Sequence, residues 1–570
     1  MKNLCGFAAV VCLVTALASV SAVPNAQAQD GNLPAGLGQD PGTQQLPLLP
    51  STTVTCSSTN NPNHVLDAAA SNPHGIPVSE IPTPLQGIGQ NQLDLFCAAV
   101  GFFQVVNSLD GVIPGVVGAT QCVPADLPAG STATISCIEV APGLGPRFNG
   151  NSCAMCHQFP GILGASSITN PELAADPSLA IPEGGVGVMD GATNSLTPFI
   201  NAGEITQTSA IREVRFIDVP NTTTPDGNVH ELFAVKGRVD ATNAININPA
   251  LGDTTCAEQQ PDFANAVSEG NVIFRIPIIV QGDGLVELID DENLKNNLAA
   301  FAGNTNGISG TFNRSGNTFN ITRFGWKAQN PSLTVFSGEA YNVEQGVTND
   351  LFPNEKRIDD DLLGETLTQI VDCQFRPLPE DTVNFVAGSS NSNEGNLTSE
   401  ISSAFFNFAF AMRLSAPPPT TALTTAEKTG QTLFAQIGCN QCHANNSTKD
   451  MVTISNSSFP VGQNSVPVLA FSDFAIHTMA SGPGLTNQYG LACLDDSVMQ
   501  GVATGNMFRS APLWGTTSRL FFLHDGRTTS LADAILFHDC AGSEAHEVIN
   551  AFVALSTTNQ DDILAYLRTL

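Results

Sequence analysis

The chain has 570 residues, of which 42% are hydrophobic and 13% are charged, and its formal net charge is −31. Its length gives room for two or three domains, and its hydrophobic content is sufficient for buried cores. A chain this acidic repels polyanions, which argues against nucleic acid or an anionic membrane surface as a partner.

The N-terminus has the pattern of a secretory signal peptide. Lys2 precedes an apolar stretch from Gly6 to Val20, and Ala26-Gln27-Ala28 matches the small-x-small cleavage pattern. We expect residues 1–28 to be removed and the mature protein to be exported, to the periplasm or to the extracellular space. The apolar stretch is short for a membrane anchor, and no later run is long enough to cross a bilayer. We therefore expect no membrane span after cleavage.

Residues 29–142 are rich in proline, glycine, serine and asparagine and contain four cysteines. We interpret them as a disulfide-rich, loop-rich N-terminal extension. Eight cysteines of the chain lie outside both the signal peptide and the two motifs described below, and in an oxidising compartment this even number predicts up to four disulfides. Cys493 and Cys540 are the first candidate pair, because they are the spare cysteines of the C-terminal part. The eight are Cys56, Cys97, Cys122, Cys137, Cys256, Cys373, Cys493 and Cys540.

Two domains are expected after the extension. The first covers residues 143–414, with many short strand-like or loop segments and few long helical patterns. Residues 415–423 form a stiff linker, because three consecutive prolines stop any helix. The second domain covers residues 424–570. A capping box at Thr424–Glu427 and an apolar helical face between Ile563 and Leu570 predict a small α-helical domain.

Each domain contains one CxxCH motif, Cys153-Ala-Met-Cys156-His157 and Cys439-Asn-Gln-Cys442-His443. Two thiols at this spacing can add to the two vinyl groups of haem, and the adjacent histidine then reaches the iron. A zinc site would need its ligand pairs brought together, and thiols outside the cytoplasm tend to oxidise. The motifs therefore predict two covalently attached c-type haems, with His157 and His443 as iron ligands.

An internal repeat supports two related domains, because three sequence matches occur in the same order. The matching segments are Phe148-x4-Cys153 with Phe434-x4-Cys439, Phe274-Arg275-Ile-Pro277 with Phe508-Arg509-Ser-Ala-Pro512, and Trp326-x5-Ser332-Leu333 with His524-x5-Ser530-Leu531.

The repeat predicts that the two irons have unlike ligands. His538 lies fourteen residues after His524, and the same step from Trp326 reaches Ala340. Alanine cannot bind iron. We therefore expect His538 to be the second axial ligand of the C-terminal haem and the N-terminal haem to have an open face.

Further polar residues have two interpretations each. Arg275 and Arg509 either pair with haem propionates or pair with acidic neighbours. His230 and His477 are candidates for pocket residues or iron ligands, but we favour hydrogen-bonded structural roles. His524 is expected to cap a turn rather than to bind iron.

Three segments, residues 143–157, 324–349 and 507–538, resemble the bacterial di-haem cytochrome c peroxidase superfamily. Within it they most resemble the di-haem oxidoreductase branch, whose members are often labelled thiol oxidoreductases. The likeness covers residues 143–570. The expected fold is mainly α with irregular loops and some short strands, built as two cytochrome c-type haem domains plus the N-terminal extension.

The resemblance implies roles for individual residues. In that superfamily a tryptophan lies between the haems and a glutamate lies over the open iron, and Trp326 and Glu344 match these positions. The methionine or tyrosine of the second haem is replaced here by His538. The distal glutamine is absent, with Thr334 near its position. A switchable distal histidine is also absent, which implies an open site without reductive activation. Ca²⁺ is a further candidate cofactor.

The leading functional hypothesis is a periplasmic di-haem oxidoreductase of the peroxidase type. Electrons from an unidentified redox protein would enter at the C-terminal haem and pass by way of Trp326 to the open haem. There a small oxidant, peroxide or O₂, would bind, and Glu344 would move a proton between the peroxide oxygens. Two alternatives stay open: a non-catalytic di-haem electron carrier, and an oxygenase or protein-oxidising enzyme. Trp326 could also be a core residue, and Glu344 a solvated loop charge.

Overall fold

The computed structural model describes residues 82–85, 90–104, 112–113, 137–138, 144–150, 152–166, 192–194, 196–206, 208–235, 261–316, 319–354, 379–381, 403–420, 422–444, 451–452 and 466–570. The predicted signal peptide, most of the predicted N-terminal extension and the spare cysteines Cys56, Cys122, Cys256 and Cys373 lie outside these residues. No helix of the described part combines the length and the apolar character that a membrane span requires.

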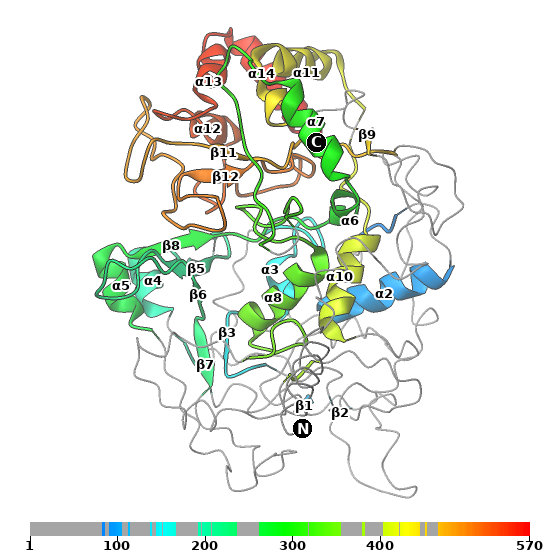
Figure 1. The fold of residues 1–570 in the computed structure, drawn as a ribbon, viewed down its shortest axis with the longest axis vertical. Coiled ribbons are helices and arrows are strands. Elements are labelled where there is room, and N and C mark those ends of the chain that lie inside the picture. Colours follow the sequence, from blue (N-terminus) through cyan, green and yellow to red (C-terminus); the bar gives the residue numbers. More distant parts are fainter. Residues whose placement is uncertain are drawn as a thin grey trace, which may run out of the picture.

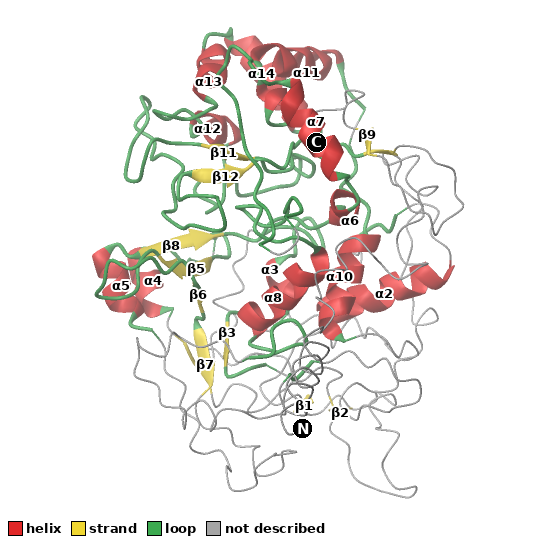
Figure 2. Ribbon diagram, viewed as in Figure 1, coloured by secondary structure: helices red, strands yellow, loops and turns green. Residues whose placement is uncertain are grey.

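Helices and short strands alternate with long irregular segments (Figures 1 and 2). The helices are α2 (Gln90–Gln104), α3 (Cys153–Cys156), α4 (Thr197–Ala202), α5 (Phe263–Glu269), α6 (Asp283–Glu287), α7 (Asp291–Ala300), α8 (Leu333–Gln345), α10 (Ala404–Leu414), α11 (Thr425–Ile437), the 3₁₀ helix η6 (Cys439–Gln441), α12 (Leu531–Leu536), α13 (His546–Val553) and α14 (Thr557–Leu567).

The strands are short and pair antiparallel. They are β1 (Val112–Ile113), β2 (Cys137–Ile138), β3 (Arg147–Phe148), β4 (Ala192–Asn194), β5 (Glu213–Phe216), β6 (Val229–His230), β7 (Phe233–Val235), β8 (Val272–Arg275), β9 (Met451–Val452), β10 (Val466–Pro467), β11 (Ile476–Thr478) and β12 (Met507–Arg509). Within the described residues the larger sheets have the orders β3-β7-β4 and β6-β5-β8, and β11 pairs with β12. The fold is therefore mixed, with helices, irregular loops and a few short strands.

The first helical unit is built around α10, which packs against both α2 and α8. Phe405, Phe408 and Phe410 of α10 are all buried, as expected for a helix that is apolar on every side. Asp381 supplies a cap from outside the helix, because its carboxylate accepts hydrogen bonds from the Ala404 and Phe405 amides at 2.9 and 3.0 Å.

Helix α2 lies within the segment that we expected to be a loop-rich extension. Its residues Phe96 and Phe103 are buried in the same core as α10, so this part of residues 29–142 belongs to the first helical unit. The first unit therefore begins before the predicted boundary at residue 143. The helix was not predicted, because the segment as a whole is rich in proline and glycine. The helix also has no acidic residue in its first turn and no basic residue in its last turn to mark its ends.

The second helical unit begins as the sequence predicts. Thr424 and Glu427 form a complete capping box at the start of α11. Helix α11 packs against α14, and Phe434 meets Tyr566 edge-to-face at the crossing. In each unit, the helix that precedes the CxxCH motif thus packs against the helix that closes the unit, α2 on α10 and α11 on α14. Figure 1 shows α11 and α14 at the top of the molecule and α2 and α10 near its middle, on the right.

The backbone also repeats in a pair of hairpin loops. Isolated bridges join Phe324 to Asn330 and Phe522 to Thr528. A positive φ occurs at equivalent positions of the two loops, at Gly325 and Ala328 in the first and at Leu523 and Gly526 in the second.

The helix that follows each hairpin begins in the same way. Ser332 caps α8 by accepting from the Val335 amide, and Ser530 caps α12 by accepting from the Asp533 amide. This confirms the repeat at the third match, and the constant offset between the loops places Ala340 and His538 at equivalent positions.

Candidate di-haem site

The two CxxCH motifs form one turn each, α3 and η6. In both, the histidine amide donates to the carbonyl of the first cysteine at 3.0 Å, from His157 to Cys153 and from His443 to Cys439. Among the described cysteines, the four of the motifs are not disulfide-bonded. Burial, followed by the charge of Glu344, raises the pKa of the Cys153 thiol to about 12. Each motif therefore presents two cysteines and a histidine from one compact turn.

Both motif histidines have one ring nitrogen held by the backbone. His157 Nδ1 lies 3.0 Å from the carbonyl of Gly164, and His443 Nδ1 lies 3.1 Å from the carbonyl of Phe471. A carbonyl can only accept, so Nδ1 carries the hydrogen and Nε2 keeps a lone pair. Burial lowers the pKa of both rings, and together with His538 it brings that of His443 to about 4. Both rings are therefore neutral at physiological pH, the form that binds a metal.

A large apolar cavity adjoins the second motif. It contains about 1380 Å³ of space not filled by protein atoms, some of it open to solvent. Cys439, Cys442 and His443 line it, and so does His538. His538 Nδ1 donates to the Ala534 carbonyl at 2.7 Å, which leaves its Nε2 available as well. The residues present fit a haem: Cys439 and Cys442 would attach it, and His443 and His538 would hold its iron.

Two guanidinium groups line the same cavity. Arg509 is 5% exposed, and its Nε has no hydrogen-bond partner within the described residues. Arg519 lies beside it, and burial lowers the pKa of both to about 10, so both stay cationic at neutral pH. Asp283 is close enough to favour the charged form of Arg509 but forms no ion pair with it. Within the described residues neither guanidinium forms an ion pair with a carboxylate, and haem carries two propionates that would supply such anions.

The sequence left the partner of Arg275 open, and the structure resolves it. Arg275 donates from Nη2 to Asp496 Oδ2 at 2.7 Å, and Lys327 Nζ lies 2.9 Å from the other oxygen of the same carboxylate. All three side chains are buried. Burial tends to raise the pKa of Asp496, but the two cations outweigh it and hold that pKa below its usual value. Arg275 is therefore part of an internal ion-pair cluster. Arg509 forms no ion pair with a carboxylate in the described part of the chain.

Trp326 lies between the surroundings of the two motifs. Its indole Nε1 donates to the Ile276 carbonyl at 2.9 Å, which fixes the ring. It lines the large cavity and also a smaller one of about 340 Å³ that Ala165 and Ile278 border. The Ile278 backbone is also a hydrogen-bonding neighbour of the His157 ring. The indole therefore forms part of the wall between the second motif and the neighbourhood of the first.

Glu344 lies in the last turn of α8, beside the first motif. The close backbone approach of Gly145 and Gly346 requires glycine, because a Cβ on either residue would overlap the other, and Gly346 has a φ of +72°. The Asn149 amide donates to the Glu344 carbonyl at 2.7 Å. The neighbouring Gln345 donates from Nε2 to the Cys153 sulfur at 3.3 Å. Glu344 is half-buried, so it is not a solvated loop charge.

Comparison with known families identifies the chain. The family described as “Di-haem oxidoreductase, putative peroxidase” matches residues 221–570, more than half of the sequence. The chain belongs to this family. The description of this family implies haem cofactors and peroxidase-like redox chemistry. The match begins after the first CxxCH motif, so the prediction of a haem at that motif rests on the motif's own residues and on the repeat.

Two solved structures are similar over part of the chain. They are a xenon-pressurised hydrazine synthase from Kuenenia stuttgartiensis and a MauG-like protein associated with microbial copper homeostasis. Identity is 17% to each, the TM-scores are 0.19 and 0.21, and the matches cover 29% and 30% of this chain and 55% of each of those chains. The chain thus spans about half the length of these structures, and a likeness this weak carries no conclusion. A comparison with curated proteins finds no match.

In this di-haem oxidoreductase, two of the remaining histidines have structural roles, as expected. His230 Nε2 lies 2.9 Å from Asp226, and its ring stacks on Phe216. His477 lies between two carboxylates, with Nδ1 2.9 Å from Glu544 and Nε2 3.1 Å from Asp473. Neither nitrogen of His477 is therefore left for iron.

His524 does not have the expected turn-capping role. Its ring stacks on Phe508 at 4.4 Å, meets Trp326 edge-on at 6.4 Å and lines the large cavity. Burial lowers its pKa to about 4, so the ring is neutral.

Thr334, which lies near the sequence position of the distal glutamine of the resembling superfamily, accepts a hydrogen bond from Arg413 at 2.8 Å.

The predicted Ca²⁺ ion has no carboxylate-rich site in the described part of the chain. No cluster of three or more His, Cys, Asp or Glu side chains there is arranged to hold a metal ion.

Arg519 lines the large cavity, and the sequence analysis did not single it out. It lies outside every repeated segment, so no sequence pattern predicts a position in the cavity. Only the fold shows that it lies beside Arg509.

Proposed function

We propose that the chain is an exported di-haem c-type oxidoreductase that reduces peroxide at its N-terminal haem site. Electrons would arrive at the C-terminal site from a redox protein and pass by way of Trp326. The observation that carries the proposal is the difference between the two repeat positions. His538 offers a ligand nitrogen to the second site, whereas the equivalent Ala340 offers none. Glu344 stands one helical turn after Ala340, on the same face of α8.

Separate residues would attach each haem, hold its iron and neutralise its propionates. His157 and His443 would each hold one iron through Nε2, His538 would complete the second site, and the four motif cysteines would form the thioether bonds. The haems, when bound, supply the one-electron redox chemistry and the iron that binds peroxide. Arg509 and Arg519 would neutralise the propionates.

Glu344 would hold and move the proton. A half-buried carboxylate beside Cys153 carries a desolvation cost, which is tolerable where proton transfer is its role. We favour peroxide over O₂ as the oxidant, because heterolysis of an O–O bond requires a proton donor near the open face, and Glu344 would supply it. The signal-peptide pattern supports export. The acidic chain favours a basic redox protein as the electron donor, and Ca²⁺ stays a candidate cofactor.

The experiment compares Glu344→Gln with wild type after mixing with peroxide. Glutamine keeps the size and hydrogen bonding of glutamate but cannot shuttle a proton. The peroxide-induced absorbance change, followed by stopped flow, should slow by roughly 10²–10⁴-fold, while the resting spectra stay the same. Glu339→Gln is the matched control, because Glu339 lies on the same helix but bonds to Asn330. Equal rates in wild type and Glu344→Gln would remove Glu344 from the reaction.

Trp326→Phe tests the connection between the two sites. The initial reaction with peroxide should persist in this variant, while electron exchange between the haems slows. A wild-type protein that does not react with peroxide at all would contradict the proposed function and favour the electron-carrier or oxygenase alternatives.

A further inference from the structure

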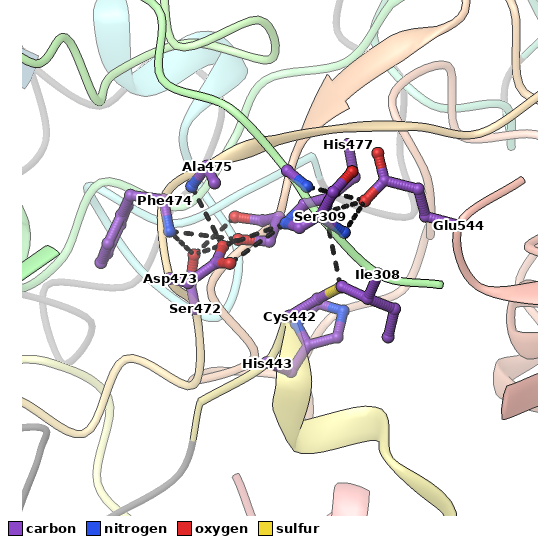
Figure 3. A network of polar contacts seen from close by, with 12 residues as sticks. Ile308, Ser309, Cys442, His443, Ser472, Asp473, Phe474, Ala475, His477 and Glu544 are labelled. Atoms are coloured by element: carbon purple, nitrogen blue, oxygen red, sulfur yellow. Dashed lines mark hydrogen bonds and ion pairs between the residues drawn. The ribbon is translucent and has the colours of Figure 1, made fainter. Parts of the chain in front are cut away.

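A polar network borders the second motif on the side of Cys442. His477 Nδ1 lies 3.7 Å from the Cys442 sulfur and 2.9 Å from Glu544, and His477 Nε2 lies 3.1 Å from Asp473. Figure 3 shows the imidazole between the two carboxylates, with Cys442 and His443 below it. The side chains of His477 and Asp473 are almost fully buried, and that of Glu544 is 12% exposed.

This geometry makes His477 a cation. Each carboxylate can only accept a hydrogen bond, so both ring nitrogens must donate, and an imidazole that donates from both carries a positive charge. The carboxylate on the Nδ1 side is ionised as well. Burial tends to raise the pKa of Glu544, but the hydrogen bond from His477 outweighs it and lowers that pKa to about 2.

The network is rigidly attached to the second motif. The Asp473 amide donates to the Cys442 carbonyl at 2.9 Å, and the same loop supplies the Phe471 carbonyl that holds His443. The charge of His477 is therefore fixed in distance from the sulfur that would join the haem.

The loop at Ser309 and Gly310, from the other half of the molecule, also binds this network through Glu544. The Ser309 and Gly310 amides each donate to Glu544 at 2.9 Å. Gly310 has a φ of +61°, and a Cβ there would lie 2.7 Å from Cε1 of His477. Only glycine allows this loop to close over the imidazole.

We propose that His477 is a positioning residue that sets the reduction potential of the C-terminal haem through its contact with Cys442. The inference rests on the proposed function, because it requires a haem on Cys439 and Cys442. Of the three charges in the network, the positive one lies against the sulfur. Reduction of iron adds an electron at the site, so a fixed cation nearby favours the reduced form, and the buried surroundings screen it little. The two carboxylates oppose this effect from the far side of the ring.

The test is a potentiometric titration of the haem-loaded protein, followed at the absorbance of the low-spin haem. His477→Gln removes the cation and should shift the potential of the C-terminal haem downward. Glu544→Gln removes one opposing carboxylate and should shift it upward. His546→Gln is the matched control, because His546 also pairs with a carboxylate, Asp539, but does not line the cavity. It should leave the potential unchanged.

Opposite shifts in the two variants identify a charge effect, since loosened packing alone has no reason to change sign between them. Equal potentials in all four proteins, each with a low-spin spectrum, would overturn the proposal and leave the proposed function intact. Shifts of the same direction in both variants would also overturn it. If His477→Gln does not fold, His477→Asn takes its place, and the same downward shift is expected. A protein with no titrating low-spin haem would contradict the proposed function itself.

Discussion

The three histidines assigned to iron share one local arrangement. His157, His443 and His538 each donate from Nδ1 to a backbone carbonyl, at 3.0, 3.1 and 2.7 Å. Such a bond fixes both the tautomer and the ring orientation before a metal arrives. His477 differs because carboxylates hold both of its nitrogens. Burial alone would not separate these histidines, but their hydrogen-bond partners do.

His538→Ala should convert the low-spin haem to a high-spin one, because the second axial nitrogen is lost while His443 remains. Electron paramagnetic resonance of the oxidised protein measures this change directly. His524→Phe is the control, since His524 lines the same cavity but does not occupy the repeat position of a ligand. A low-spin signal that survives in His538→Ala and disappears in His524→Phe would show that the register is wrong.

Glu544 predicts an acid-sensitive contribution to stability. Its pKa is lowered to about 2 in the folded chain, from an ordinary value of 4.5. The folded state therefore binds this proton less readily than the unfolded state, so the stabilisation is present above pH 4.5 and is lost as the pH falls towards 2. Urea unfolding at pH 6 and pH 3 should show a smaller loss of stability in Glu544→Gln than in wild type. The same loss in both proteins would contradict the assignment.

Residue-level prediction succeeded where a pattern repeats and failed where a partner is distant. The two CxxCH turns and the matching serine caps of α8 and α12 follow from local spacing, whereas the ligand role of His538 stays a prediction. Asp496 could not be assigned to Arg275, because 221 residues separate them and no local signal connects them. Arg519 was missed for the same reason.

At the scale of elements, the matching hairpins do the most to position the site. Each carries a bulky ring at the same place, Trp326 in the first and His524 in the second, and the two rings meet at the cavity wall. The capping box of α11 was predictable because its residues are close in sequence. Helix α2 was not, because it lies within a segment of proline-rich and glycine-rich composition and lacks charged residues at its ends.

A disulfide secures the element that carries His538. Cys493 and Cys540 are bonded, as expected from the sequence, with their Cα atoms 5.8 Å apart, and both are buried. Cys540 follows His538 by two residues. Replacing both cysteines by serine should lower the free energy of unfolding by about 2–4 kcal/mol, because the unfolded chain loses a crosslink.

Denaturant unfolding measures this loss, and wild type treated with a thiol reductant should show a loss of similar size. If the serine variant unfolds at the same denaturant concentration as oxidised wild type, the disulfide contributes nothing to stability.

At the scale of the whole molecule, the two halves are joined by buried polar contacts near the candidate haem sites. The Arg275–Asp496–Lys327 cluster links β8 to the segment before β12, and Glu544 binds the loop at Ser309 and Gly310. Such contacts fix the relative placement of the two candidate sites, which the proposed electron exchange by way of Trp326 would require. The sequence predicted two related units, but it could not predict these links, because they depend on the packing of distant segments.

The central claim is that one chain holds two unlike haems, a six-coordinate one at the C-terminal site and an open one at the N-terminal site. Electron paramagnetic resonance of the oxidised, haem-loaded protein, with the haem content fixed by intact mass, tests it most directly. We predict two haems per chain, with one low-spin bis-histidine signal and one high-spin signal of equal abundance. Two low-spin signals, or a mass that corresponds to a single haem, would contradict the account.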